Sequence, residues 1–140
     1  MTQLACLWAV SDVVTGWLLA FMFQVAHVVE GIAFPKADPA GSVPLGWAAA
    51  QLATTADFSH GSWVWTHFSG GLNYQSVHHL FPGICHCYYP ALAPIVMRTA
   101  AEFSVPYNVF PTFGAALCAH FRHLKSSGRR VGIPTLSTIG

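Results

Sequence analysis

The feature that most constrains this chain is an apolar run from Leu4 to Val29 in which Asp12 is the one charged residue. A helix that crosses a bilayer needs about 20 apolar residues at a rise of about 1.5 Å each. The segment Leu4–Phe23 meets that length if Asp12 faces other helices rather than lipid. Because the run lacks a basic region before it and a small-residue cleavage site, it does not resemble a signal peptide. We predict a membrane-spanning helix, with a buried core helix as the alternative.

The composition agrees with a membrane protein and excludes several classes of function. Charged residues make up 8% of the 140 residues and the formal net charge is +1, whereas an average soluble domain has roughly 25% charged residues. Nucleic-acid binding has no electrostatic basis, because the longest basic run is Arg129-Arg130. The five acidic residues are scattered, so a catalytic carboxylate pair of the glycosidase kind is not expected. The eight histidines are the residues that need an explanation.

The distribution of basic residues predicts an orientation. All six Lys and Arg residues follow the apolar run, so the positive-inside rule places the region after it in the cytosol. The four cysteines should then be reduced thiols; they are Cys6, Cys85, Cys87 and Cys118. Cys85-His86-Cys87 has neither the spacing of common zinc knuckles nor a second pair. We expect its cysteines to be buried or interfacial small residues.

The remaining sequence predicts short helices joined by loops. Residues 31–46 contain three prolines and form a predicted loop, and the aromatic segment 61–68 suits a bilayer interface. Helices are predicted for residues 47–55, 72–80, 89–103 and 112–125, the last with Thr112 as its N-cap and Gly128 beyond its end. The tail from Arg129 to Gly140 is expected to be frayed. Since no convincing strand pair is visible, the expected fold class is all-α, with residues 1–29 as the transmembrane helix and residues 30–140 as a helical cytosolic region.

The pattern Gln75-Ser76-Val77-His78-His79 has the clearest chemical meaning. On a helix, positions i, i+3 and i+4 share one face, so Gln75, His78 and His79 project to the same side. Adjacent histidines lie about 100° apart around the axis and can serve two neighbouring metal ions instead of chelating one. Neutral imidazole suits iron, copper and zinc. The spacing alone leaves both metal binding and a role as hydrogen-bonded core residues open.

Residues 70–82, GGLNYQSVHHLFP, resemble the third histidine box of membrane fatty acyl desaturases. They are most similar to the front-end class, which fuses a cytochrome b5 domain at its N-terminus and carries Gln where related desaturases have the first histidine of the box. Residues 23–27, FQVAH, resemble the end of the last transmembrane helix, and residues 50–57 resemble the stretch before the box. Residues 88–95 and 111–125 resemble the delta-5 branch of microalgae and other protists. The resemblance covers roughly residues 4–130.

The resemblance implies a site for two iron ions held almost entirely by histidines of three boxes and one outlying histidine. It assigns His78 and His79 as ligands from the third box and His27 as the outlying ligand. Gln75 takes the place of a ligand and could bind directly, through a water molecule, or not at all. The interpretation requires that His27, His78 and His79 converge on one pocket.

The first two boxes of the family, H-x(3,4)-H and H-x-x-H-H, have no match here. The chain therefore looks like the C-terminal portion of a longer enzyme. We expect a membrane protein fragment, with one transmembrane helix followed by a helical cytosolic cap that carries part of a histidine-rich di-iron site. Three histidines cannot complete a two-iron site, so we expect the fragment to be inactive alone.

Several further side chains have candidate roles around this site. Asp57 and Asn73 could hydrogen-bond the distal nitrogen of a ligand, and Asn73 could equally cap the box helix. The candidates to line a narrow apolar channel that measures the acyl chain, or else to anchor the chain at the bilayer interface, are Trp63, Trp65, Phe68 and Tyr74. His60 and His67 are expected at the interface or beside the ligands. A solvated helix face near lipid headgroups is expected for His120, Arg122, His123 and Lys125.

The resemblance implies a polyunsaturated fatty acid desaturase that places a cis double bond between an existing double bond and the carboxyl end of an acyl chain. It implies the use of dioxygen and of electrons that pass from NADH through a reductase and the cytochrome b5 haem. The expected location is the endoplasmic reticulum membrane, with the metal site facing the cytosol. Delta-5 selectivity is favoured, while delta-6, delta-4 and sphingolipid desaturases of the same build stay open. A non-catalytic membrane module with a structural metal is the alternative from another class.

Overall fold

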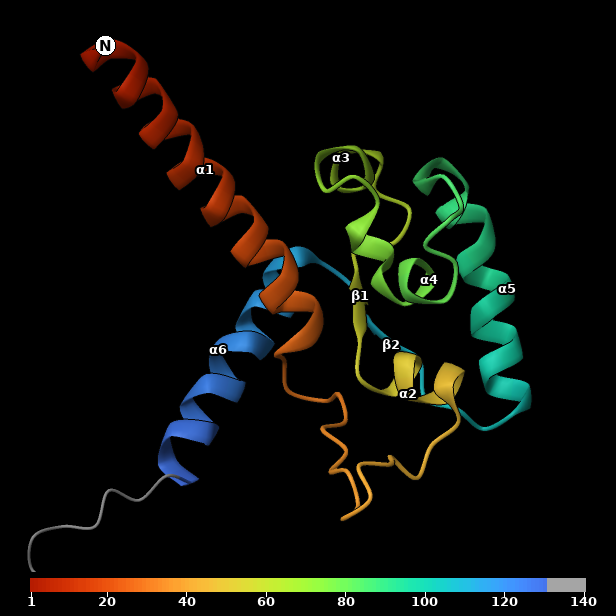
Figure 1. Ribbon diagram of the computed structural model, residues 1–140. Helices are drawn as coiled ribbons and strands as arrows, with labels where there is room; N and C mark the ends of the chain where they lie inside the picture. The colour runs from red at the N-terminus through yellow and green to blue at the C-terminus, as the bar shows by residue number, and fades with distance from the viewer. Residues whose placement is uncertain (131–140) are drawn as a thin grey trace, which may run out of the picture.

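The computed structural model describes residues 1–130, which fold mostly into helices (Figure 1). The helices and strands are α1 (Thr2–His27), α2 (Trp47–Ala53), β1 (Ala56–Phe58), α3 (Trp63–Phe68), α4 (Gln75–Leu80), α5 (Tyr89–Glu102), β2 (Asn108–Phe110) and α6 (Phe113–Arg130). Two 3-10 turns, η1 (Leu72–Tyr74) and η2 (His86–Tyr88), precede α4 and α5. Of the tail predicted to be frayed, residues 131–140 lie outside the described part of the chain.

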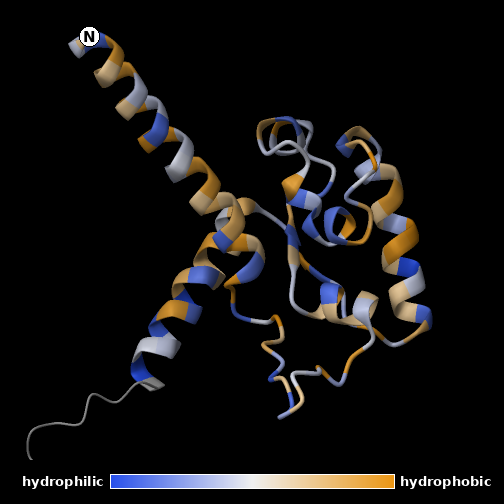
Figure 2. Cartoon of the chain, in the orientation of Figure 1, coloured by the Kyte–Doolittle hydropathy of each residue, from blue (hydrophilic) through white to orange (hydrophobic). Residues whose placement is uncertain are grey.

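Helix α1 has the length and composition of a membrane span. It contains 26 residues, and its most apolar stretch has no residue buried against the rest of the chain. The alternative of a buried core helix is therefore not what the structure shows. Figure 1 shows α1 projecting away from the other elements, and Figure 2 shows that apolar residues dominate its length. Only its last turns are packed, where Met22, Val25 and Ala26 are buried.

The all-α expectation is wrong at one place, because β1 and β2 form a parallel pair. Ala56 pairs with Asn108, Asp57 with Val109, and Phe58 with Phe110. Each strand has three residues, and all three residues of β1 are buried. A strand this short, buried on both faces, shows no alternation of apolar and polar residues, which is the signal that sequence patterns provide.

Two groups of apolar side chains flank the strand pair. On one side, α2, α4 and α5 share a core that includes Leu52, Val77 and Val96. On the other side, the end of α1 packs against β1 and α6 through Val25, Phe58 and other residues. The box helix α4 therefore lies between β1 and α5 (Figure 1).

Helix α6 differs from its prediction in length and in one face. It continues to Arg130, past Gly128, because a glycine in an exposed helix costs only about 1 kcal/mol and does not stop the helix by itself. His120 is buried, and its Nδ1–H donates to the Val28 carbonyl oxygen at 2.6 Å. It is therefore not part of a solvated face. His123 is partly buried and stacks on Phe34. Arg122 and Lys125 are exposed as predicted.

All four cysteines, which lie within the described residues, are exposed and free of disulfides. Of the two expectations for Cys85 and Cys87, burial is wrong, and an interfacial position stays a prediction. Both residues lie on the surface of the turn η2 and the segment before it, because the residues between Phe81 and Tyr88 are all exposed.

Candidate metal centre

The box helix α4 is fixed at its first turn by a buried carboxylate. The Ser76 backbone N–H donates to Asp57 Oδ1 at 2.7 Å, and Asp57 is completely buried in β1. Ahead of the helix, the backbone of Gly71 has a φ of +84°, and a Cβ at this position would collide with the Cβ of His86. A glycine is therefore required where the chain turns into the box.

The structure brings the predicted ligands from α1 and α4 together. The ring centroids of His27 and His79 are 4.9 Å apart, and those of His78 and His79 are 6.0 Å apart. Nε2 of Gln75 lies 3.1 Å from Nε2 of His27, across 48 residues of sequence. The end of α1 thus meets the box helix at these four side chains.

Two residues that the sequence reasoning missed orient the box histidines. Nδ1–H of His79 donates to the amide oxygen of Gln51 at 2.6 Å, and Nδ1 of His78 lies 3.2 Å from the Tyr89 hydroxyl. A hydrogen bond to one ring nitrogen selects the other nitrogen for metal binding and fixes the ring. Gln51 is the only polar residue in the alanine-rich sequence of α2, and that isolation is the signal that could have pointed to it.

Asp57 and Asn73 do not hydrogen-bond His27, His78 or His79. Besides Ser76, Asp57 accepts from the Tyr107 hydroxyl at 2.6 Å and from Nε2–H of His60 at 2.8 Å. Burial and the neighbouring Asp57 raise the pKa of Tyr107 far above its ordinary value. Asp57 therefore joins β1, the box helix and the segment before β2.

Asn73 has a structural role in the turn ahead of the box. Its side-chain N–H groups donate to Thr66 Oγ1 at 3.2 Å and to the Ser59 carbonyl oxygen at 3.4 Å. These bonds connect the end of α3 with the segment after β1. The predicted capping of the box helix by Asn73 is wrong, because the N–H of Ser76 donates to Asp57 instead.

The local environment favours the neutral form of a box histidine. Burial, followed by the rings of His27 and His78, lowers the pKa of His79 below its ordinary value, and Asp57 opposes this effect. Neutral imidazole is the form that binds metal ions. Around neutral pH His79 is thus available as a ligand through Nε2.

The donor set fits part of a metal site. The side-chain oxygen of Gln75 is buried and has no hydrogen-bond partner, whereas its N–H donates to His27. A cation beside this amide would satisfy the orphaned oxygen. Three imidazoles and one amide are neutral ligands that suit iron, copper or zinc. Within residues 1–130, however, no three His, Cys, Asp or Glu side chains lie close enough together to hold a metal ion, so His27, His78 and His79 are neighbours in pairs and do not form a three-ligand group in this structure.

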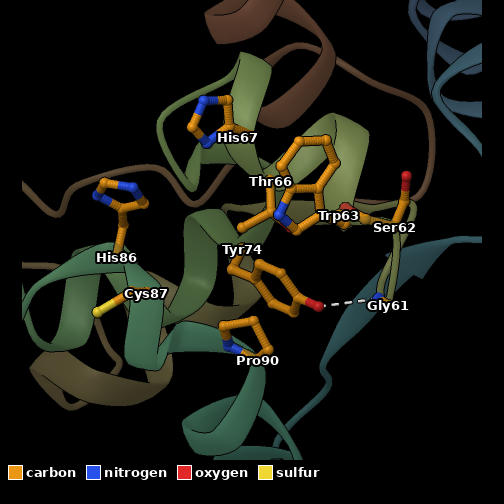
Figure 3. A pocket seen from close by; sticks show the side chains of 9 residues that line it. All are labelled: Gly61, Ser62, Trp63, Thr66, His67, Tyr74, His86, Cys87 and Pro90. Carbon is orange, nitrogen blue, oxygen red and sulfur yellow. Dashed lines mark hydrogen bonds between the residues drawn. The ribbon is translucent and has the colours of Figure 1, made fainter.

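The four aromatic residues predicted to line a channel or to anchor the chain lie in different surroundings. Trp65 stacks on Phe113, and Phe68 is 58% exposed. Trp63 and Tyr74 line a hollow of about 300 Å³ (Figure 3). The Tyr74 hydroxyl accepts the N–H of Gly61 there. His67 and His86 line the same hollow, whereas His60 stacks on Tyr74 and bonds Asp57.

An apolar groove of about 450 Å³ lies between α2, α4 and α5. Leu52 and Leu80 line it, and each directly follows a residue of the site, Gln51 and His79. The groove is thus lined by residues of the two helices, α2 and α4, that carry Gln51 and His79. Its full lining is Ala48, Ala49, Leu52, Leu80, Phe81, Ile95, Val96, Thr99, Ala100, Phe103 and Val105.

Comparison with known proteins decides the family. The profile described as "Fatty acid desaturase" matches residues 1–111. The chain belongs to the fatty acid desaturase family. The front-end relationship predicted from residues 70–82 is confirmed by its relatives, which are acyl-lipid desaturases and hence oxidoreductases. No solved structure matches this desaturase chain.

Three relatives show the range of similarity. The Acyl-lipid (8-3)-desaturase of Physcomitrium patens is 60% identical over 122 residues, which cover 87% of this chain and 25% of the relative. The Delta(5) fatty acid desaturase A of Dictyostelium discoideum is 40% identical, with 91% of this chain and 28% of the relative covered. The sn-1 linoleoyl-lipid 6-desaturase of Synechocystis sp. is 42% identical, with 81% and 32% covered. The chain thus spans about a quarter to a third of the length of these relatives.

Proposed function

We propose that this chain supplies the third histidine box, the outlying histidine and the last membrane span of a front-end acyl-lipid desaturase. The observation that carries the proposal is the meeting of His27 and Gln75 with His78 and His79, from two elements far apart in the sequence. In this assignment His27, His78 and His79 are iron ligands. Gln75 lies beside them as a direct or water-mediated partner. When bound, two iron ions completed by further histidines would supply the dioxygen chemistry of desaturation.

The residues of this chain then have distinct tasks. Gln51 and Tyr89 hold the rings of His79 and His78, and Asp57 fixes the start of the box helix. The apolar groove between α2, α4 and α5 is the path that best fits an acyl chain, because it is almost wholly apolar and shares the helices α2 and α4 with the site. Of the aromatic candidates, Trp63 and Phe68 are exposed and suit the bilayer interface. Trp65 and Tyr74 would hold this segment in place by packing against the rest of the chain.

The proposed setting is the endoplasmic reticulum membrane. Residues 1–29 span it, and residues 30–140 face the cytosol, because all six basic residues follow the span. Electrons would come from NADH through a reductase and a cytochrome b5 domain of the whole protein. The favoured reaction is a delta-5 desaturation of a lipid acyl chain. The names of the relatives include (8-3)-, Delta(5) and 6-desaturases. They therefore support delta-5 selectivity and, equally, desaturation at position 6.

A chimera tests the proposal. The chain replaces the aligned segment of the Physcomitrium patens relative, to which it is 60% identical, in a microbial host fed twenty-carbon polyunsaturated acids. We expect a product with a new double bond at the delta-5 position and two iron ions per purified molecule. His78→Ala and His79→Ala should abolish the product and lower the iron content, whereas His123→Ala, which removes a ring stacked on Phe34, should change neither.

Other outcomes point to the alternatives. A double bond at position 6 or 4 would contradict the delta-5 assignment and retain the family. One zinc ion, or no metal, together with no product would favour the non-catalytic membrane module.

A further inference from the structure

Two cysteines lie together on the turn that joins the box helix to α5. Cys85 and Cys87 flank His86, and the Cys87 thiol donates to the Cys85 sulfur at a distance of 3.4 Å. Both side chains are exposed. A disulfide bond is about 2.05 Å long, so the two sulfur atoms need to approach by about 1.4 Å to form one.

The two thiols are not equivalent. The backbone of Cys87 and then its thiol hydrogen-bond the Cys85 sulfur and lower the pKa of Cys85. The same thiol contact raises the pKa of Cys87. A thiolate is the reactive form of cysteine. We therefore expect Cys85 to react first, and the thiol of Cys87, 3.4 Å away, lies where it can attack the product.

The surroundings give small molecules access to this pair. Cys87 and His86 line the rim of the 300 Å³ hollow shown in Figure 3. The other two cysteines of the chain, Cys6 on α1 and Cys118 on α6, lie on different elements and have no thiol partner in residues 1–130. Cys118 is exposed outside the proposed span and provides the internal control.

We propose that Cys85 and Cys87 form a reversible thiol–disulfide switch that responds to small disulfides. The Cys85 thiolate attacks one sulfur of the small disulfide, which forms a mixed disulfide and releases one thiolate. The Cys87 thiolate then attacks the Cys85 sulfur and releases the second thiolate. The protein loses two electrons and two protons, and the small disulfide is reduced to two thiols.

The position of the pair connects it with the candidate metal centre, and this part of the inference rests on the proposed function. Two residues after Cys87, the Tyr89 hydroxyl contacts Nδ1 of His78 at 3.2 Å. On the other side, the Cβ of His86 lies against the backbone of Gly71, ahead of the box helix. The turn η2 therefore lies between two contacts that hold the box, and closing the disulfide moves this turn. We expect the Tyr89–His78 contact to change as a result.

Mass spectrometry tests the switch directly. The full chain, in detergent, is equilibrated with oxidised and reduced glutathione, alkylated and cut with trypsin. The peptide of residues 37–98 contains Cys85 and Cys87 and no other cysteine. We expect this peptide to lose both reactive thiols and to become lighter by two hydrogen atoms, while the peptides with Cys6 and Cys118 carry at most a bound glutathione. Dithiothreitol should restore both thiols.

Single variants separate the two roles. Cys87→Ser should accumulate glutathione on Cys85, and Cys85→Ser should react more slowly at Cys87. The proposal is overturned if the wild-type peptide carries only bound glutathione or stays fully reduced when Cys118 has reacted. It is also overturned if the two variants react at equal rates.

Amide hydrogen exchange of the unloaded chain tests the connection to the box. Oxidation should change exchange in residues 75–80 and 89–93 of the wild type and leave Cys85→Ser unchanged. Unchanged exchange in the oxidised wild type would contradict the connection. Since neither readout needs iron or activity, failure of the switch is distinguishable from failure of the proposed function.

Discussion

Gln51 illustrates how a single side chain can decide the orientation of a ligand. Its amide oxygen accepts from Nδ1–H of His79, and thereby leaves Nε2 of that ring for a metal ion. Because the bond joins residues 28 positions apart, the isolated polar residue in α2 is visible in the sequence but its partner is not. Asp57 and Asn73, which lie closer to the box in sequence, were the reasonable candidates for this role and have other partners.

Loss of the Gln51 acceptor should weaken metal binding. We expect Gln51→Leu in the chimera to lower iron affinity by about 10- to 100-fold, as removal of such partners does at other metal sites. Gln51→Glu keeps an acceptor oxygen and should retain most of the affinity. Iron content after dialysis against a graded chelator measures both. An equal loss of iron affinity in both variants would show that the acceptor oxygen of residue 51 does not determine the affinity.

The Tyr107–Asp57 hydrogen bond should contribute to stability. Tyr107→Phe leaves a buried carboxylate with one partner fewer, which costs about 1.5–3 kcal/mol for a bond to a charged group. Tyr88→Phe is the matched control, because Tyr88 is 61% exposed and surface changes stay within about 0.5 kcal/mol. Thermal unfolding of the full chain in detergent compares them, and similar melting temperatures would refute the expectation.

At the scale of elements, the box helix depends on its neighbours. Helix α4 has six residues, whereas isolated helices shorter than about 12–15 residues are marginal in water. Its stability therefore comes from the Asp57 contact at its start, from the turn at Gly71, and from packing of Val77 against α5.

The two glycines ahead of the box should respond differently to substitution. At Gly71 an added methyl group collides with His86, and at Gly70 it meets nothing, although both residues have positive φ. Gly70→Ala should cost about 1–2 kcal/mol from backbone strain alone. Gly71→Ala adds the collision, and overpacking typically costs a further 1–3 kcal/mol or so. Thermal unfolding of both variants measures the difference, and a Gly70 variant as unstable as the Gly71 variant would contradict it.

The groove between α2, α4 and α5 should accept the acyl chain. Ala49 lines the groove, so Ala49→Leu partly fills it. We expect kcat/KM of the chimera to fall by about tenfold, in line with the 1–3 kcal/mol cost of overpacking. Ala91→Leu on exposed α5 surface is the control and should leave it unchanged. Product formation at several substrate concentrations gives the ratio, and equal rates for both variants would place the acyl chain elsewhere.

For the molecule as a whole, the sequence predicted the elements that depend on a local residue pattern. The apolar length of α1 and the box spacing are local, and both elements were expected. The β1–β2 pair, the burial of His120 and the partners of His78 and His79 all join distant segments. Such contacts are set by the packing of the complete chain. The resemblance to a family identified the candidate ligand histidines, but it did not identify the side chains that hydrogen-bond their rings.

The membrane assignment of α1 makes a prediction for the entire chain. Leu18 and Leu19 are exposed near the middle of the helix. Replacing both with Lys should release the chain from membranes in alkaline carbonate, because each charge costs about 2.5–3.5 kcal/mol at the centre of a span. Leu124→Lys on α6 is the exposed control and should stay in the membrane fraction with the wild type. Retention of the double variant would show that α1 does not span the bilayer.

The parallel pairing of β1 with β2 has a consequence for how the protein is made. Strand β1 precedes the box, and β2 follows α5, so the box lies inside a loop that closes only when Phe58 meets Phe110. A ribosome has to deliver Tyr107 before Asp57 gains its contact with that residue, and Asn108–Phe110 before β1 gains its partner strand. The contacts around the centre are thus completed only after β2 has been synthesised. A nascent chain stalled before this point would lack the Tyr107–Asp57 hydrogen bond and the β1–β2 pairing.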